Sequence, residues 1–402
     1  MFFKHLIKNL FFLLFILILL FSFDISFASE GNSLNLNARS CVVLDRNSKK
    51  IIFGKNEYNR VKMASTTKIM TATVIIENCD LSQTVTVSKK AAGTGGSRLG
   101  LKTGDKITIR DLLYGLLLCS GNDAAIALAE TAAGSVQNFS NMMNNKAKEL
   151  GLNNSHFESP HGLDSDNHYT TAYELALLAD YALQNSTFRN IVGTKNYTIT
   201  INGYPKNITN TNELLGSLDG VYGVKTGFTN GANRCLVTSC KRGEMDIICV
   251  VLGCDTKNFR TQDSIKLINY TFENFEYLDI KNLIDRKFEN YKNNNTNPFE
   301  INKGVSNDLE IRCFSTEPSI IPIKKDEKNS IKVNFELKKN LEAPINANLK
   351  VGSFMVYSDN RTILEGDILT TNSIDKKKPS YYFSSIFKNF SSILNNSFSS
   401  LF

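Results

Sequence analysis

Hydrophobic positions in the first two thirds of the chain follow two spacings, every second residue near both ends and every third or fourth residue in between. Two strand-like runs, 39–44 and 50–53, flank a polar turn and predict an opening hairpin. The helical spacing then takes over, and Thr108, Ser135 and Thr171 stand where helix caps are expected. The helices so predicted cover residues 65–77, 111–119, 123–133, 136–150 and 172–183.

A strand-like spacing returns after these helices. The segment 222–228 leads into two apolar runs, 235–240 and 246–252, which a glycine-containing turn joins. A last helical pattern covers residues 263–275. A hairpin, a block of helices, then strands and a helix indicate one α/β domain whose sheet is built from both ends of this region.

The composition changes from about residue 281 onward. An asparagine run at 293–295 marks a linker or an exposed loop. Short alternating runs then predict a small all-β domain, and they cover residues 310–313, 331–337, 348–357 and 362–368.

The last segment, 379–402, carries apolar residues at every third or fourth position, with serine, asparagine and lysine between them. Three lysines, Lys376 to Lys378, precede it. Its apolar runs are too short to span a bilayer, but the pattern predicts an amphipathic helix that lies in a membrane surface. A helix docked on the protein's own core is the alternative.

The first residues have the pattern of a secretory signal peptide. Two lysines precede an apolar run, 10–23, and the small-residue site Ser26-Phe27-Ala28 follows. A transmembrane helix fits less well, because the run is short and ends at Asp24. We expect cleavage after Ala28, export, and a location on the outer face of the cytoplasmic membrane with the C-terminal helix as a peripheral anchor.

The composition is that of a globular protein. The 402 residues are 42% hydrophobic and 21% charged, and the net charge is +7 with a pI near 8.8. The basic residues form no stripe with interleaved aromatics, so nucleic-acid binding is not expected. The cysteines in or beside strand-like runs lack the C-x-x-C spacing of a zinc site and are interpreted mainly as buried core residues, with one disulfide left open. They are Cys41, Cys235, Cys240, Cys249 and Cys254.

Candidate chemistry begins at the segment Ser65-Thr66-Thr67-Lys68. Residues three apart on a helix share a face, so the Lys68 amine projects beside the Ser65 hydroxyl. A serine attacks a carbonyl only when a base takes its proton, and Lys68 can do so if burial and a nearby cation keep it partly neutral. Lowering a lysine pKa by roughly 3 units costs about 4 kcal/mol, so a second cation is expected nearby.

Ser-x-x-Lys alone is a weak signal. The same pattern occurs at Ser373 and Ser385, and most such pairs are solvated on a helix surface. Here two further motifs follow it, Ser120-Gly121-Asn122 and Lys225-Thr226-Gly227. Three motifs in this order are far more specific than any one of them alone.

Similar motifs elsewhere in the chain fit less well. Lys102-Thr103-Gly104 precedes the middle motif, and Ser358-Asp359-Asn360 lies in the predicted β domain. Ser120, in contrast, interrupts two apolar helices, and Lys225 enters a strand that a hairpin follows. This context selects the copies that begin at Ser120 and Lys225.

With these motifs the chain resembles the D-alanyl-D-alanine carboxypeptidases, the low-molecular-mass penicillin-binding proteins, over essentially its whole mature length. In that family the middle motif is commonly Ser-Gly-Asn, as here, and His161-Gly162-Leu163-Asp164 also matches. The resemblance implies an α/β catalytic domain of the penicillin-binding protein and β-lactamase type. This domain is an antiparallel sheet flanked by helices plus a helical subdomain, followed by a small all-β domain and an amphipathic helix. The expected divisions are 1–28, 29–278, 279–375 and 376–402.

The resemblance also implies a mechanism. Ser65 attacks the peptide bond between two D-alanines to form an acyl-enzyme, and Lys68 takes its proton. Ser120 and Lys225 complete the proton network, and the side-chain amide of Asn122 binds a substrate carbonyl. The implied substrates are peptidoglycan stem peptides that end in D-Ala-D-Ala, and β-lactams are expected to acylate the same serine.

Two further needs of that reaction have candidate residues. The tetrahedral oxyanion requires fixed donors, which the resemblance places at the backbone N–H groups of Ser65 and Phe228. The free carboxylate of the substrate is expected to meet Lys225-Thr226-Gly227 and Arg260, whose offset from this motif matches the family's arginine. No cofactor and no metal are expected.

Three alternatives remain at this point. A Ser-His-Asp triad with His161 and Asp164 lacks a Gly-x-Ser-x-Gly elbow, and we assign His161 a structural role. A β-lactamase shares the motifs but must deacylate rapidly, and no counterpart of that family's deacylating glutamate is found. A wall-binding scaffold with an inactive site needs neither Ser65 nor Lys68.

Overall fold

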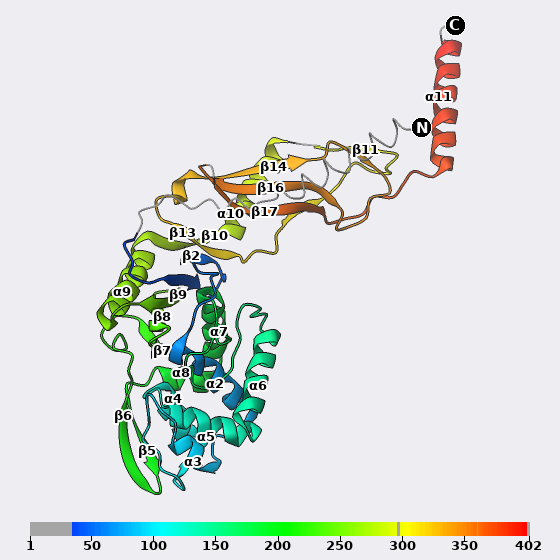
Figure 1. The fold of residues 1–402 in the computed structure, drawn as a ribbon. Helices are drawn as coiled ribbons and strands as arrows, with labels where there is room; N and C mark the ends of the chain where they lie inside the picture. The colour runs from blue at the N-terminus through cyan, green and yellow to red at the C-terminus, as the bar shows by residue number, and fades with distance from the viewer. Residues whose placement is uncertain (1–33, 296–297, 360, 400–402) are drawn as a thin grey trace, which may run out of the picture. The chain divides into compact units, whose positions relative to one another are not determined.

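The computed structural model describes residues 34–295, 298–359 and 361–399, and its first part is built around a five-stranded antiparallel sheet (Figure 1). The predicted signal peptide lies outside the described residues. The strand order is β2-β1-β9-β8-β7, and β1 pairs with β9, so both ends of this region meet in one sheet as predicted. The strands are β1 (Ser40–Asp45), β2 (Ile51–Lys55), β7 (Val221–Thr229), β8 (Asn233–Arg242) and β9 (Met245–Cys254).

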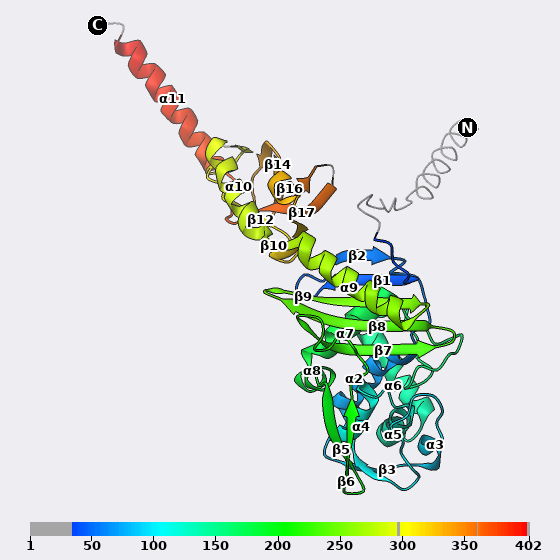
Figure 2. The ribbon, with the colours of Figure 1, turned by 90° about the vertical axis from the view of Figure 1, so that its left-hand side faces the viewer.

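Helices cover both faces of this sheet (Figure 2). On one face α9 (Lys257–Asn274) packs against β8 and β9, and on the other α7 (Ala172–Gln184) packs against β1 and β9. The middle strands are therefore buried on both sides, which explains why β8 and β9 have nearly continuous apolar sequences.

The helical subdomain stands between β2 and β7 in the sequence. Three of its helices begin at the predicted caps, because the hydroxyls of Thr108, Ser135 and Thr171 each accept a backbone N–H from three residues further on. The elements not yet named are η1 (Ala64–Thr67), α2 (Lys68–Asn78), β3 (Thr84–Thr86), α3 (Lys89–Ala92), β4 (Lys106–Thr108), α4 (Ile109–Leu117), α5 (Asn122–Ala133), α6 (Val136–Glu149) and α8 (Ser186–Val192).

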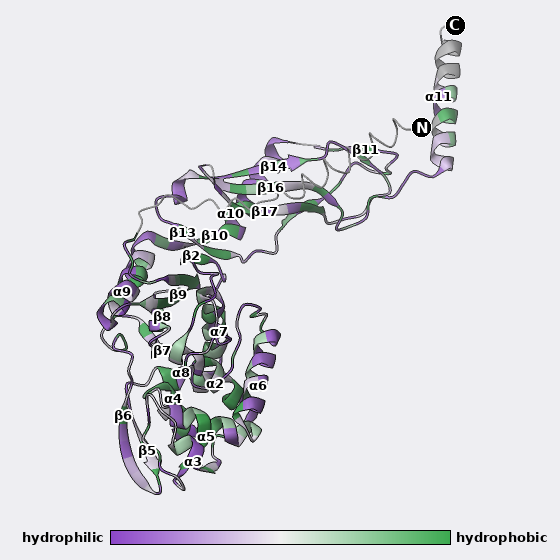
Figure 3. Cartoon of the chain, viewed as in Figure 1, coloured by the Kyte–Doolittle hydropathy of each residue, from purple (hydrophilic) through white to green (hydrophobic). Residues whose placement is uncertain are grey.

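Several features of this region, among them β3, β4, α3 and α8, were not predicted, and two others affect the site and the surface. Ser65 lies in the 3-10 turn η1, so the α-helix predicted from residue 65 begins at Lys68 instead. The strands β5 (Asn196–Ile201) and β6 (Tyr204–Thr209) form a polar hairpin, and Figure 3 shows its hydrophilic character. Its turn is Asn202-Gly203, and both residues have positive φ (52° and 83°), as a tight two-residue hairpin turn requires.

The second part of the chain contains the predicted β-rich domain. Its four-stranded antiparallel sheet has the order β12-β17-β16-β14, and its strands lie on the runs predicted from the sequence. An unpredicted helix, α10 (Ile280–Asn294), contributes Ile284 and Phe288 to the core of this domain, so the segment expected to be a linker is the end of a helix. The strands of the sheet are β12 (Ile311–Phe314), β14 (Ile331–Leu337), β16 (Lys350–Ser358) and β17 (Arg361–Thr370).

Shorter elements and a helix near the C-terminus make up the rest of the described residues. The predicted tail forms α11 (Pro379–Ser399), and several of its aromatic side chains are exposed. No helix in the described part of the chain combines the length and hydrophobicity needed to span a bilayer. The short elements are β10 (Phe275–Asp279), β11 (Glu300–Asn302), β13 (Ile320–Lys324), η2 (Lys328–Ser330) and β15 (Asn340–Glu342).

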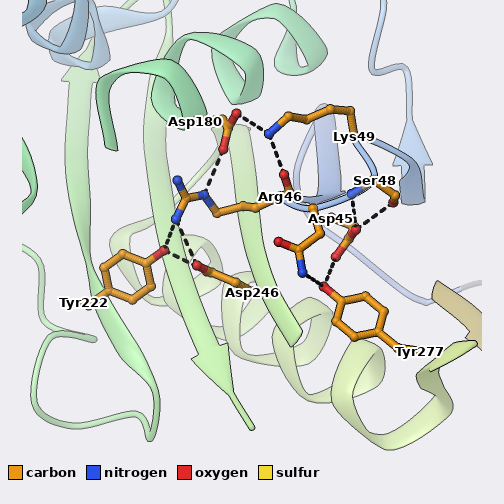
Figure 4. A network of polar contacts seen from close by, with 9 residues as sticks. Asp45, Arg46, Ser48, Lys49, Asp180, Tyr222, Asp246 and Tyr277 are labelled. Carbon is orange, nitrogen blue, oxygen red and sulfur yellow. Dashed lines mark hydrogen bonds and ion pairs between the residues drawn. The ribbon is translucent and has the colours of Figure 1, made fainter. Parts of the chain in front are cut away.

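A network of ion pairs holds the turn between β1 and β2 (Figure 4). Arg46 donates through Nε to Asp180 and through Nη1 to Asp246, both at 2.9 Å. The hydroxyl of Tyr222 donates to the other oxygen of the Asp246 carboxylate, Oδ1, at 2.7 Å. Because these partners belong to α7, β9 and β7, the network ties the opening hairpin to the strand that carries Lys225.

All eight cysteines are free thiols, so the disulfide left open by the sequence is not formed. Those at positions 41, 235, 240, 249 and 254 are buried, which confirms the prediction that they are core residues. Burial raises the pKa of the Cys235 thiol to about 11 and thereby disfavours the reactive thiolate.

Candidate active site

Ser65 and Lys68 lie side by side where η1 passes into α2. Nζ of Lys68 is 2.8 Å from Oγ of Ser65, and also 2.8 Å from both Oδ1 of Asn122 and the carbonyl oxygen of His161. The last two atoms can only accept hydrogen bonds, whereas a hydroxyl can donate as well. A neutral amine fits this set, because its two N–H groups serve the two carbonyls and its lone pair faces the Ser65 O–H.

The surroundings favour that neutral state. Lys68 is completely buried, and burial, with the charge of Lys225 as the second cause, holds its pKa well below the usual value. Lys225 is buried too, and burial together with the charge of Arg260 lowers its pKa to about 7. Lys225 is therefore the second cation that the sequence argument required.

The backbone around the nucleophile is held in an uncommon conformation. Ala64 has φ of 49°, in the left-handed region that residues with a side chain seldom occupy. Gly162 packs against its carbonyl group so closely that a Cβ at Gly162 would lie 2.0 Å from the Ala64 oxygen. The loop 161–164 therefore packs directly against the turn at Ser65, which agrees with the structural role predicted for His161.

The middle motif occupies the start of α5. Ser120 also has a left-handed backbone (φ 61°) and is buried, and no hydrogen bond joins its hydroxyl to Lys68 or Lys225 in the described part of the chain. Asn122 accepts from Lys68 and donates through Nδ2 to the carbonyl oxygen of Gly95 at 2.7 Å. Its amide is therefore fixed in one orientation.

Asp123, which follows the motif, was not predicted to matter. Its buried carboxylate accepts the backbone N–H groups of Leu99, Gly100 and Leu101 at 2.8, 2.7 and 3.0 Å. The loop beside the site is thereby attached to the N-terminus of α5. The acidic residue directly after Ser-Gly-Asn was the available sequence signal, because acidic residues are favoured in the first turn of a helix.

The third motif lies on β7, the edge strand of the sheet. Nζ of Lys225 donates to the carbonyl oxygen of Thr226 at 2.9 Å, and the Thr226 hydroxyl lies 2.8 Å from that of Thr211. A Cβ at Gly227 would lie 3.2 Å from the Ala64 Cβ, so this glycine lets β7 approach η1. Phe228 is half exposed.

Arg260 is buried in α9 and is not free. Its Nη2 pairs with Oε1 of Glu213 at 2.5 Å, whereas its Nε has no hydrogen-bond partner within the described ranges. Burial alone would raise the pKa of Glu213, but a hydrogen bond from Thr261 and the charge of Arg260 hold it below the usual value. Sequence reasoning missed Glu213, which no motif marks.

His161 and Asp164 do not form a triad with Ser65. Nδ1 of His161 accepts the N–H of Leu163 at 3.2 Å, and burial followed by the charge of Lys68 lowers its pKa to about 3. The carboxylate of Asp164 instead accepts from the Thr229 hydroxyl at 2.6 Å and the Gly231 N–H at 2.9 Å. Among the residues that the structure covers, no group of histidine, cysteine and acidic side chains is arranged to hold a metal ion.

The fold and this site define a serine peptidase of the penicillin-binding type. The chain belongs to the D-alanyl-D-alanine carboxypeptidase family, which matches residues 27–256. Residues 291–376 match the C-terminal domain of penicillin-binding protein 5. Both the family and the fold class predicted from the three motifs are confirmed.

Relatives of known name cover most of the chain. The D-alanyl-D-alanine carboxypeptidase DacF of Bacillus subtilis is 34% identical over 347 residues, 84% of this chain and 86% of the relative. The solved structure of DacD from Francisella tularensis has a TM-score of 0.70 at 26% identity and covers 86% of this chain and 95% of its own. Penicillin-binding protein 5 from Haemophilus influenzae has a TM-score of 0.68 at 28% identity, with coverages of 86% and 100%.

Proposed function

We propose that this D-alanyl-D-alanine carboxypeptidase works through an acyl-enzyme on Ser65. One observation carries the proposal: the buried amine of Lys68 has two partners that can only accept and a third, Ser65 Oγ, that can donate to it at 2.8 Å. A base placed in this way takes the Ser65 proton as Oγ bonds to the substrate carbonyl carbon.

The proposed steps use the remaining motif residues. When the tetrahedral intermediate collapses, the C–N bond to the terminal D-alanine breaks, and the leaving amine takes the proton that Lys68 accepted, with Ser120 and Lys225 proposed to relay it. Water then adds to the acyl carbon while the same residues accept its proton. The bond between that carbon and Ser65 Oγ breaks, Oγ takes the proton back, and the shortened peptide leaves as a carboxylic acid. Asn122 acts by fixing the Lys68 amine and by offering its second amide N–H to a substrate carbonyl.

The edge position of β7 suits substrate alignment. An extended peptide can add to an exposed sheet edge through main-chain hydrogen bonds. We assign the oxyanion donors to the N–H groups of Ser65 and Phe228, which belong to η1 and to this edge strand, and Gly227 lets the two approach each other. Loss of one such donor typically lowers the rate about 100- to 1,000-fold.

The substrate proposed is a peptidoglycan stem peptide that ends in D-Ala-D-Ala. Its free carboxylate would be received by Lys225, the Thr226 hydroxyl and the positive charge of Arg260, which Glu213 holds in place. β-Lactams would acylate Ser65 by the same route.

The test uses residues 29–402 and the variant Ser65→Ala. Stable labelling by a fluorescent penicillin and release of D-alanine from a pentapeptide, both absent in the variant, are the expected results. Rapid penicillin turnover without peptide cleavage would instead indicate a β-lactamase, and no labelling would indicate an inactive scaffold.

We further propose export through the segment 1–28 and surface anchoring through α11. The anchor is supported by the exposed side chains of Tyr381, Phe383 and Phe387 and by the preceding lysines, which would face anionic lipid headgroups. Deleting residues 376–402 should abolish co-sedimentation with anionic vesicles but leave penicillin labelling intact. Binding that persists after the deletion would refute the anchor. We also propose that the boundary between the catalytic domain and the β domain lies at 278/279.

A further inference from the structure

The peptide bond just before the proposed nucleophile is held by a buried chain of two hydrogen bonds. The hydroxyl of Thr67 donates to the carbonyl oxygen of Ala64 at 2.7 Å. Nε2 of His168, which is 101 residues away in the sequence, lies 2.7 Å from the same hydroxyl oxygen. Both side chains are at most 2% exposed, so water does not compete for these bonds.

The direction of each bond follows from the neighbouring groups. The backbone N–H of Glu158 donates to Nδ1 of His168 at 3.0 Å, so the neutral ring carries its proton on Nε2. Burial, as the main cause, lowers the pKa of His168 to about 4, which keeps the ring neutral at pH 7. His168 therefore donates to Thr67, and the hydrogen of the Thr67 hydroxyl is directed at Ala64.

Fixing the Ala64 carbonyl has a consequence on the other side of the peptide plane. The Ala64–Ser65 bond is trans, so its C=O and the N–H of Ser65 point in opposite directions from one rigid plane. Gly162 closes the space beside the carbonyl, and the left-handed φ of Ala64 means that this plane needs support from its surroundings. The Thr67 hydrogen bond supplies that support.

We propose that His168 and Thr67 are positioning residues that aim the Ser65 N–H at the oxyanion of the transition state. Neither touches the substrate, since both act through the Ala64–Ser65 peptide. The inference rests on the proposed role of Ser65. It predicts a loss of transition-state stabilisation with little change in KM, because the oxyanion exists only after attack.

The chain offers a matched pair of threonines for the test. Thr66 is also buried, and its hydroxyl donates to the carbonyl oxygen of Met63 at 2.6 Å, the same i to i−3 bond one residue earlier. Thr67→Val and Thr66→Val therefore remove equivalent hydroxyls, but only the first frees the Ala64–Ser65 peptide. Thr67→Ser keeps the hydroxyl and serves as the conservative variant.

Each variant would be assayed for kcat and KM on a D-alanyl-D-alanine peptide and for its affinity for a peptide boronic acid, whose adduct with Ser65 carries the tetrahedral oxygen. Thr67→Val should lower kcat and the boronate affinity by a similar factor of about 10 to 100, less than complete loss of a donor. Thr67→Ser and Thr66→Val should stay near the wild type. His168→Phe should lower activity on its own but cost no further activity in the Thr67→Val background.

Three results would overturn the proposal. They are equal losses in Thr66→Val and Thr67→Val, an unchanged boronate affinity when kcat falls, and additive effects of His168→Phe and Thr67→Val. Thermal unfolding of each variant shows that the protein assayed is folded. Failure of the proposed function itself would be recognised separately, because the wild-type protein would then release no D-alanine from the pentapeptide.

Discussion

The protonation state of one buried side chain, Lys68, governs the proposed chemistry. Its three partners fix the position of the amine, and burial plus the charge of Lys225 disfavour its protonated form. Asp123 acts in the opposite direction, because its negative charge raises the pKa of Lys68. The pKa of Lys68 thus depends on burial away from water, on one positive charge that lowers it and on one negative charge that raises it.

These opposing charges predict that removing one of them shifts the pH dependence of the acylation rate. Lys225→Gln removes a positive charge near Lys68, so Lys68 should protonate more readily, and less of it is the neutral base at a given pH. The rising limb of the penicillin acylation rate against pH should therefore move to higher pH. Lys195→Gln is the control, because Lys195 donates to the carbonyl of Leu215 outside the motifs. An unshifted limb in Lys225→Gln would contradict the electrostatic argument.

A second residue-scale prediction concerns glycine. Gly162 and Gly151 both have left-handed backbones (φ 84° and 70°), but a Cβ at Gly151 meets nothing within 4 Å, whereas one at Gly162 meets the Ala64 carbonyl. Gly151→Ala should cost about 1–2 kcal/mol of unfolding free energy, the ordinary conformational penalty. Gly162→Ala should cost about 3 kcal/mol or more because a clash is added. Urea denaturation measures both, and equal costs would mean that the loop simply moves away.

Some residues of the site could be found from the sequence and others could not. The sequence predicted Ser65, Lys68 and Asn122 because short motifs mark them, and the structure brings these three together. His168 and Glu213 were not, since their partners are brought to them only by the folded chain. Contacts between distant residues leave no local pattern.

At the scale of elements, local chemistry predicted the helix starts best. The caps at Thr108, Ser135 and Thr171 are each a single hydroxyl bonded within one turn, so three residues suffice to recognise them. The helix α10 was missed because asparagine and lysine dominate it. Its apolar stripe of Ile280, Ile284 and Phe288 at a spacing of four was nevertheless present.

The link between α5 and the loop beside the site can be tested by a single substitution. Asp123→Asn keeps the shape but removes the charge that accepts three backbone N–H groups, so we expect a loss of about 2–4 kcal/mol in unfolding free energy. Asp80→Asn is the control, because Asp80 accepts the Ser82 N–H at the surface and should change little. Equal stability of the two variants would show that the loop does not depend on α5.

At the scale of the whole molecule, the absence of cross-links among the eight cysteines makes stability independent of the redox state. The thermal midpoint should be the same with and without a reductant, because no disulfide constrains the unfolded chain. Alkylation under denaturing conditions without reduction should add eight groups per molecule. Six groups would reveal a disulfide.

The pairing of β1 with β9 also limits when the catalytic sheet can form during synthesis of the chain. β1 pairs early with β2, which follows it directly, but its other partner β9 is synthesised only after the entire helical part. Pairings between such distant segments form slowly, because a long loop must close before they contribute any stability. The catalytic sheet therefore cannot close early in translation. The export proposed above would therefore act on a chain whose catalytic sheet has not yet closed.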